Sequence, residues 1–161
     1  MNKQEFLKRA SVKNMKQMRG HDAPSYEWDV YFDNKKICNC WDDSFGGELQ
    51  ITDYKGQSIE NIYNKIGKES LWDKEYKWTT SLELLMSEIH SIGLFKKDEK
   101  KGVIVGKNNN YNIIGFNTSI PTTFKKWNDS KKAYQEIIDK AIKEGKEILN
   151  VEYLKTWGLN I

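Results

Sequence analysis

The chain has 161 residues, of which 38% are hydrophobic, 12% aromatic and 30% charged, and its formal net charge is +3. This composition supports one ordinary domain with a hydrophobic core and excludes a proline-rich disordered chain. No apolar run approaches the ~20 residues that a membrane-spanning helix needs. Residues 1–20 lack the apolar core of a signal peptide. We therefore expect a cytoplasmic protein with no membrane contact.

The first predicted element is a helix. Apolar side chains recur at helical spacing from Phe6 through Met18, which predicts a helix over Lys3–Arg19. Gly20 follows as a plausible helix stop, and Pro24 lies shortly beyond it.

A β-hairpin is predicted next, because apolar and polar residues alternate from Tyr26 onward. With a two-residue turn at Asn34-Lys35, Val30 would face Asn39 and Trp28 would face Trp41. The two cysteines, Cys38 and Cys40, would then lie on the opposite, polar face. A third strand around Leu49 and Ile51 would complete a three-stranded antiparallel meander.

Two helices are predicted after the meander. The first runs over Ser58–Ile66, with Ser58 as its N-cap, and the second follows a cap at 79–81 and stops at Gly93. The segment between them is ambiguous, and its aromatic residues suit a core or a sheet edge. These aromatic residues are Trp72, Tyr76 and Trp78.

The second half of the chain begins with a charged loop at 96–101 and continues into a second hairpin, Val103–Val105 with Tyr111–Phe116. A connection at Ile120-Pro121 leads to a long helix capped at 129–130 and ended by Gly145, and then to a final helical turn or two. The order of elements predicts an α+β fold. It is a single domain with a mainly antiparallel sheet, a three-stranded meander plus a hairpin, packed with about four to five helices. A split into two lobes near residues 96–101 is the alternative.

Metal binding and catalysis find little support in the sequence. Cys38 and Cys40 with His21 and His90 would supply four ligands, but a one-residue gap within a strand is unlike known zinc sites. The same spacing disfavours a disulfide, so we expect reduced thiols. No nucleophile, metalloprotease or phosphate-loop motif occurs. We expect no enzyme, no cofactor and no metal.

A metal-dependent enzyme that uses the carboxylates of Asp42 and Asp43 with a histidine is the third hypothesis. The calcium-loop spacing is missing around these residues, and aspartates in turns usually accept hydrogen bonds from local backbone N–H groups. We therefore expect a solvated turn.

An acidic surface on the first hairpin and the loop after it is the leading candidate for binding a protein or ribonucleoprotein partner. Opposite charges on the two halves of the chain would steer a charged partner. Exposed aromatic residues such as Tyr31, Phe45 or Trp72 would strengthen such an interface. The acidic residues are Asp29, Asp33, Asp42, Asp43 and Glu48.

Direct binding of RNA or single-stranded DNA is the alternative, because lysines and aromatic residues interleave in the second half of the chain. The lysines are interrupted by acidic residues, and no RNA-recognition motif occurs. The candidate residues are Lys96, Lys97, Lys100, Lys101, Lys107, Tyr111, Lys125, Lys126 and Trp127.

The segments Asn34–Cys38 and Asp42–Glu48 are typical of lysine- and asparagine-rich chains. With this lysine- and asparagine-rich composition, the chain resembles small orphan α+β proteins of phages and mobile elements, including anti-CRISPR inhibitors. The resemblance is one of type and transfers no functional residue. It implies a non-catalytic protein that inhibits a host-defence nuclease complex of the CRISPR type by occupying it.

Overall fold

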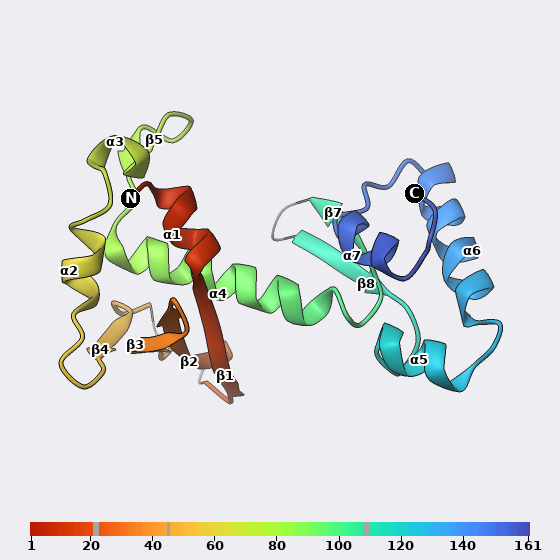
Figure 1. Cartoon of the computed structure of the whole chain (residues 1–161), viewed down its shortest axis with the longest axis horizontal. Helices are drawn as coiled ribbons and strands as arrows, with labels where there is room; N and C mark the ends of the chain where they lie inside the picture. Colours follow the sequence, from red (N-terminus) through yellow and green to blue (C-terminus); the bar gives the residue numbers. More distant parts are fainter. Residues whose placement is uncertain (21–22, 45, 108–109) are drawn as a thin grey trace. The chain divides into compact units, whose positions relative to one another are not determined.

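A computed structural model describes residues 1–20, 23–44, 46–107 and 110–161 of the chain (Figure 1). The fold is α+β with antiparallel sheets, as predicted. The chain divides into two compact units, Met1–Gly93 and Leu94–Ile161, and each has its own hydrophobic core. The boundary lies within helix α4 (Leu82–Asp98), just before the predicted split at 96–101.

A four-stranded antiparallel sheet forms the framework of the first unit. Its central strands bury Trp28 and Val30 on one face, against buried side chains of the surrounding helices such as Phe6 and Leu85. The strands, in spatial order, are β1 (Ala10–Met18), β2 (Ser25–Phe32), β3 (Lys35–Asp42) and β4 (Gln50–Asp53). The other helices of this unit are α1 (Lys3–Arg9), α2 (Ile59–Tyr63) and α3 (Lys68–Leu71).

The predicted helix over Lys3–Arg19 is wrong beyond Arg9. The chain turns into β1 at Ala10, and Val12 pairs with Val30 of β2. A β-bulge between Lys13 and Lys16 interrupts the alternation of side chains along β1. Because the bulge breaks the period of two, the apolar residues of this strand imitate a helical stripe in the sequence.

The predicted turn and register of the first hairpin are also wrong. The turn residues are Asp33 and Asn34, with φ of 48° and 64°, which suits a two-residue type I′ turn. A second bulge follows, because the register passes from the Tyr31–Lys36 pair to the Val30–Cys38 pair and leaves Ile37 unpaired.

This change of register exchanges the two faces of β3. Cys38 and Cys40 are fully buried in the core, beside Trp28, which pairs with Cys40. Asn39 and Trp41, which were predicted to lie on the apolar face, lie on the outer face of the sheet and are partly exposed.

Gly93 does not stop α4, contrary to the prediction. A Cβ atom at this position would lie 1.9 Å from Cγ2 of Val12, so the glycine allows the helix to approach β1 closely. The N-terminal cap of α4 was predicted correctly, because Oγ of Ser81 accepts a hydrogen bond from the backbone N–H of Leu84 at 3.3 Å. Ser58 caps α2 in the same way, accepting from the N–H of Asn61.

The second unit contains the predicted second hairpin, β7 (Val103–Lys107) and β8 (Asn110–Ile114). Its core surrounds Tyr134, which is fully buried. Gly145, with φ of 69°, follows the end of the long helix as predicted. No helix in the described ranges is long and apolar enough to cross a bilayer. The helices of this unit, besides the end of α4, are α5 (Ile120–Lys126), α6 (Ser130–Lys143) and α7 (Val151–Thr156).

Candidate functional site

The acidic residues predicted to bind a partner do not form one cluster. Asp33 lies in the hairpin turn, whereas Asp42 ends β3 at the opposite end of the hairpin. A strand of eight residues spans ~26 Å at ~3.3 Å per residue. Nε of Arg9 donates to Asp33 at 2.9 Å, and this ion pair holds the pKa of the Asp33 carboxyl below its usual value.

Asp29 is a buried carboxylate whose charge is balanced locally. Its oxygens accept hydrogen bonds from Lys36 at 2.7 Å, Asn14 at 2.8 Å and Asn39 at 3.0 Å. Burial raises the pKa of Asp29, but these three hydrogen bonds more than offset it, and the net shift is downward. Asp29 therefore organises this face of the sheet through contacts with residues of the two neighbouring strands.

The remaining acidic residues lie at the end of β3 and in the loop that follows it. One oxygen of Asp42 accepts a hydrogen bond from the backbone N–H of Ser44 at 2.9 Å, the local turn contact that the sequence predicts. Asp43 is half-buried and Glu48 is exposed. Among the described residues, no group of three or more histidine, cysteine, aspartate or glutamate side chains could hold a metal ion. His21 and Phe45 lie outside the described residues.

The buried thiols belong to the core, and the partly buried His90 packs against it. The sulfur atoms of Cys38 and Cys40 lie 4.0 Å apart, and this contact together with burial raises the pKa of the Cys40 thiol. The imidazole of His90 stacks on the indole of Trp28 with ring centroids 4.2 Å apart. Burial lowers the pKa of His90, and the nearby carboxylate of Asp42 partly offsets this effect.

Most of the predicted lysines are exposed on the second unit. The carbonyl of Lys100 accepts a hydrogen bond from the N–H of Ile120 at 2.7 Å, so the start of α5 adjoins the segment 96–101. Lys125 and Lys126 lie in the last turn of α5. Of the lysines predicted to bind nucleic acid, only Lys101 forms an ion pair within the described part of the chain, with Asp98 at 2.6 Å.

The aromatic residues of this region divide into two kinds. The hydroxyl of Tyr111 donates to Asp98 at 2.9 Å, and burial together with this carboxylate raises the pKa of Tyr111 to about 12, so its ring is part of the fold. Trp127 is 40% exposed and meets the ring of Phe116 edge-on, with centroids 5.2 Å apart. Lys107 lies apart from the other lysines, at the tip of the β7–β8 hairpin. The basic–aromatic surface, as we name it, comprises Lys96, Lys97, Lys100, Phe116, Lys125, Lys126 and Trp127.

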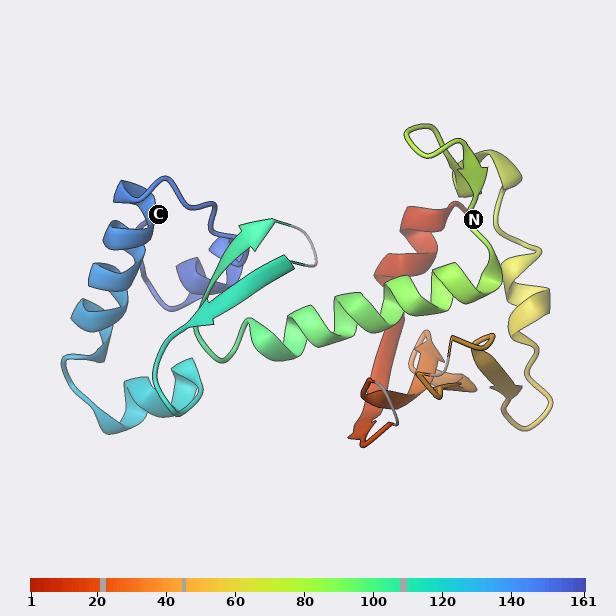
Figure 2. The ribbon, with the colours of Figure 1, turned by 180° about the vertical axis from the view of Figure 1, so that it is seen from behind.

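A third surface was not predicted as such. The ambiguous segment after α3 forms a small hairpin, β5 (Trp72–Asp73) and β6 (Trp78–Thr79), which we name the aromatic hairpin. Trp72, Tyr76 and Trp78 are 49%, 60% and 52% exposed. The rings of Tyr76 and Trp78 stack with centroids 5.3 Å apart. Figures 1 and 2 show this hairpin projecting beside α3, at the opposite end of its unit from the β1–β4 sheet.

The turn of the aromatic hairpin is held by one carboxylate. Oδ1 of Asp73 accepts hydrogen bonds from the backbone N–H groups of Glu75 and Tyr76 at 2.9 and 3.0 Å. Trp72 pairs with Thr79 and Asp73 pairs with Trp78, so the two tryptophans lie on opposite faces of the ribbon. The signal in the sequence was the presence of four charged residues among three aromatic ones over 72–78, a composition that a buried segment would not tolerate.

The chain thus presents an aromatic hairpin and a basic–aromatic surface, each on one of the two units. Among the acidic candidates, Asp29 and Asp33 form ion pairs, whereas the other three lie at the end of β3 and in the loop after it. The chain was compared with protein-family models, curated proteins and solved structures, and no match was found in any of the three comparisons.

Proposed function

We propose that this chain acts by binding a protein or ribonucleoprotein complex, without catalysis, and that the aromatic hairpin makes the main contact. The observation that carries the proposal is the exposure of Trp72, Tyr76 and Trp78 on one projecting ribbon. The resemblance in type to anti-CRISPR inhibitors names the partner class to test first, a host-defence nuclease complex.

The chemistry of protein interfaces supports this proposal. Exposed apolar patches mark interaction sites, and the stacked rings of Tyr76 and Trp78 form such a patch on one face of the ribbon. Tryptophan and tyrosine are enriched among the residues that dominate binding energy. The aromatic side chains occupy both faces of the ribbon, so a partner would have to surround it. The charged residues of the turn, Lys74, Glu75 and Lys77, would form a polar rim.

An affinity capture tests the proposal. The wild-type chain and the triple variant Trp72→Ala, Tyr76→Ala, Trp78→Ala are used as baits in extracts of the host cells, with and without nuclease treatment. We expect the wild type to retain a stoichiometric protein after nuclease treatment and the triple variant to lose it. Ile142→Ala is the matched control, because Ile142 is an equally exposed apolar residue, 52%, on α6. Equal capture by all three baits would disprove the assigned contact.

Nucleic-acid binding is the second candidate, and the basic–aromatic surface favours it. Leu94–Ile161 carries 13 lysines and eight acidic residues, a net charge of +5, whereas Met1–Gly93 carries 13 basic and 15 acidic residues, a net charge of −2. Exposed lysines beside a half-exposed tryptophan are the components that single-stranded nucleic acids bind. Such a surface could also contact the RNA of a ribonucleoprotein partner.

A further inference from the structure

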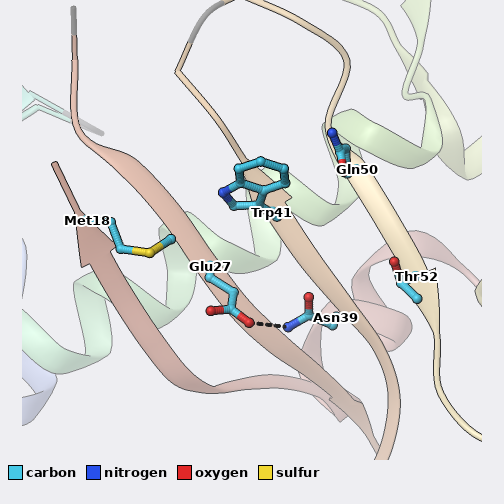
Figure 3. A pocket seen from close by; sticks show the side chains of 6 residues that line it. All are labelled: Met18, Glu27, Asn39, Trp41, Gln50 and Thr52. Carbon is cyan, nitrogen blue, oxygen red and sulfur yellow. Dashed lines mark hydrogen bonds between the residues drawn. The ribbon is translucent and has the colours of Figure 1, made fainter. Parts of the chain in front are cut away.

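The outer face of the β1–β4 sheet contains a shallow pocket of about 300 Å³ (Figure 3). The ladder pairing sets its geometry, since Glu27, Trp41 and Gln50 form one row across three strands and Asn39 and Thr52 form the next. The positions therefore depend on the sheet and not on loops, which favours a preformed site. The lining residues are Met18, Glu27, Asn39, Trp41, Gln50 and Thr52.

One part of the pocket is a flat apolar surface. The indole of Trp41 is 38% exposed, and Figure 3 shows it between Glu27 and Gln50. Met18, 40% exposed, adds a polarisable thioether. A planar ring can stack on such an indole without disturbing any contact that the core requires.

The polar groups of the pocket are of two kinds. The carboxylate of Glu27 is occupied, because one oxygen pairs with Lys16 at 3.1 Å and the other accepts from Nδ2 of Asn39 at 3.3 Å. Nδ2 of Asn39 also donates to Asp29, so the amide of Asn39 is fixed in orientation. By contrast, within the described part of the chain the side chains of Gln50 and Thr52 form no hydrogen bonds. Gln50 offers neutral donors and acceptors beside Trp41 in the same row, and Thr52 offers a hydroxyl in the next row.

We propose that this sheet-face pocket binds a nucleobase, stacked on Trp41 and hydrogen-bonded by Gln50 and Thr52. Amides pair with the mixed donor and acceptor edges of bases, and aromatic side chains supply the stacking surface. The ammonium of Lys16, whose side chain is 63% exposed, pairs with Glu27 beside the pocket. The base could belong to a free nucleotide or to a single strand.

The assignment goes beyond the proposed partner contact and shares no residue with either surface described above. Nuclear magnetic resonance of the ¹⁵N-labelled chain tests it directly. The probes are AMP, UMP and a mixed-sequence single-stranded RNA of about four to eight nucleotides. We expect the indole N–H signal of Trp41 and the side-chain amide signal of Gln50 to shift. Shifts with AMP or UMP would show that a single nucleotide is sufficient, and shifts with RNA alone would show that the base must belong to a strand.

Single substitutions in the pocket distinguish base stacking on Trp41 from nonspecific binding of the probe elsewhere on the protein. Trp41→Ala is expected to weaken binding of the probe that shifts these signals about tenfold, the effect of removing one stacking interaction. Gln50→Ala is expected to change the preference among bases. The controls are Ile113→Ala, whose side chain is equally exposed at 38%, and Gln57→Ala, an exposed glutamine in a turn. Both should bind as the wild type does.

Three results would overturn the assignment. The first is the absence of shifts at Trp41 and Gln50 with every probe. The second is the same shifts with ribose 5-phosphate, which contains no base. The third is an unchanged affinity of Trp41→Ala for a probe that shifts the signals. If the third result occurs, lysine variants of the basic–aromatic surface should be the ones that lose RNA binding. That outcome would place the nucleic-acid site on the basic–aromatic surface instead.

Discussion

Asn150 binds three backbone groups of the stretch from Glu99 to Ile104 in the second unit. Its Oδ1 accepts from the N–H of Ile104 at 2.9 Å, and its Nδ2 donates to the carbonyls of Gly102 at 2.8 Å and Glu99 at 3.2 Å. The side chain is almost fully buried, so water cannot replace these hydrogen bonds. A single amide therefore joins the start of β7 to the segment before α7.

Replacement of Asn150 by leucine should destabilise the protein by about 2–3 kcal/mol, because the buried N–H and carbonyl groups lose their partners while the volume is nearly kept. Urea denaturation followed by circular dichroism measures the change. Asn128→Leu is the control, since Asn128 is exposed, and it should stay within about 0.5 kcal/mol of the wild type. A change at Asn150 as small as that of the control would contradict the assigned role.

His90 should make stability depend on pH. Burial holds its folded pKa below the ordinary value of 6.5, so the unfolded chain binds more protons between the folded pKa and about 6.5. Stability is therefore full above about pH 6.5 and falls as the pH drops below it. His90→Phe, which keeps a ring against Trp28, should flatten this dependence. The urea midpoints of the wild type and of His90→Phe are measured at pH 7.5 and at pH 5.5. An equal loss of stability in both proteins between the two pH values would refute the prediction.

At the scale of elements, close approach between α4 and β1 explains why a glycine lies inside a helix. Gly93→Ala adds a favourable helix former, worth about 1 kcal/mol. Its Cβ would nevertheless lie 1.9 Å from Val12, which forces the helix and strand apart. Overpacking of this kind costs about 1–3 kcal/mol.

We therefore expect Gly93→Ala to lower the thermal midpoint and Val12→Ala to restore part of the loss in the double variant, because the shorter side chain leaves room for the new methyl group. Differential scanning calorimetry of the wild type, the two single variants and the double variant gives the coupling free energy between positions 12 and 93. Additive effects would show that the contact is not the cause.

Local signals in the sequence predicted the elements that depend on local chemistry. Ser58 and Ser81 cap their helices, and Gly145 ends α6, because capping and positive φ need only neighbouring residues. The errors lie where bulges break the strand period, at Lys13–Lys16 and around Ile37. These bulges depend on the partner strand, which a period of apolar residues does not reveal.

The candidate sites were predicted less well, for a similar reason. Exposure of Lys96, Lys97, Lys125 and Lys126 follows from their charge. By contrast, the network around Asp29 depends on Asn14 and Lys36, which come from other strands. Trp41 was placed on the apolar face of the hairpin because the predicted register was wrong, and this error hid the sheet-face pocket.

At the scale of the whole molecule, charge is divided between the two units, with −2 on Met1–Gly93 and +5 on Leu94–Ile161. Binding of single-stranded nucleic acid by the basic unit would release counterions, so the affinity would fall as the salt concentration rises. This salt dependence distinguishes the basic–aromatic surface from stacking at the sheet-face pocket.

A quadruple variant tests the basic–aromatic surface and carries Lys96→Gln, Lys97→Gln, Lys125→Gln and Lys126→Gln. In a plot of log affinity for single-stranded RNA against log salt concentration, we expect its slope to be smaller than that of the wild type. The reduction should be about 0.7 for each phosphate that a lysine no longer neutralises. Fluorescence anisotropy across a salt series measures the slope. Lys140→Gln with Lys146→Gln is the control, because both lysines pair with Glu144. A slope equal to that of the control would exclude the basic–aromatic surface from RNA binding.

The central claim is that the aromatic hairpin contacts a partner protein, and photo-crosslinking from position 76 tests it most directly. A photoreactive phenylalanine derivative replaces Tyr76, which is 60% exposed, or Ile142, which is 52% exposed and serves as the control. We predict that position 76 alone cross-links in host cells to one protein, and that the product resists nuclease. Cross-links from both positions alike, to nucleic acid only, or to nothing would contradict the claim.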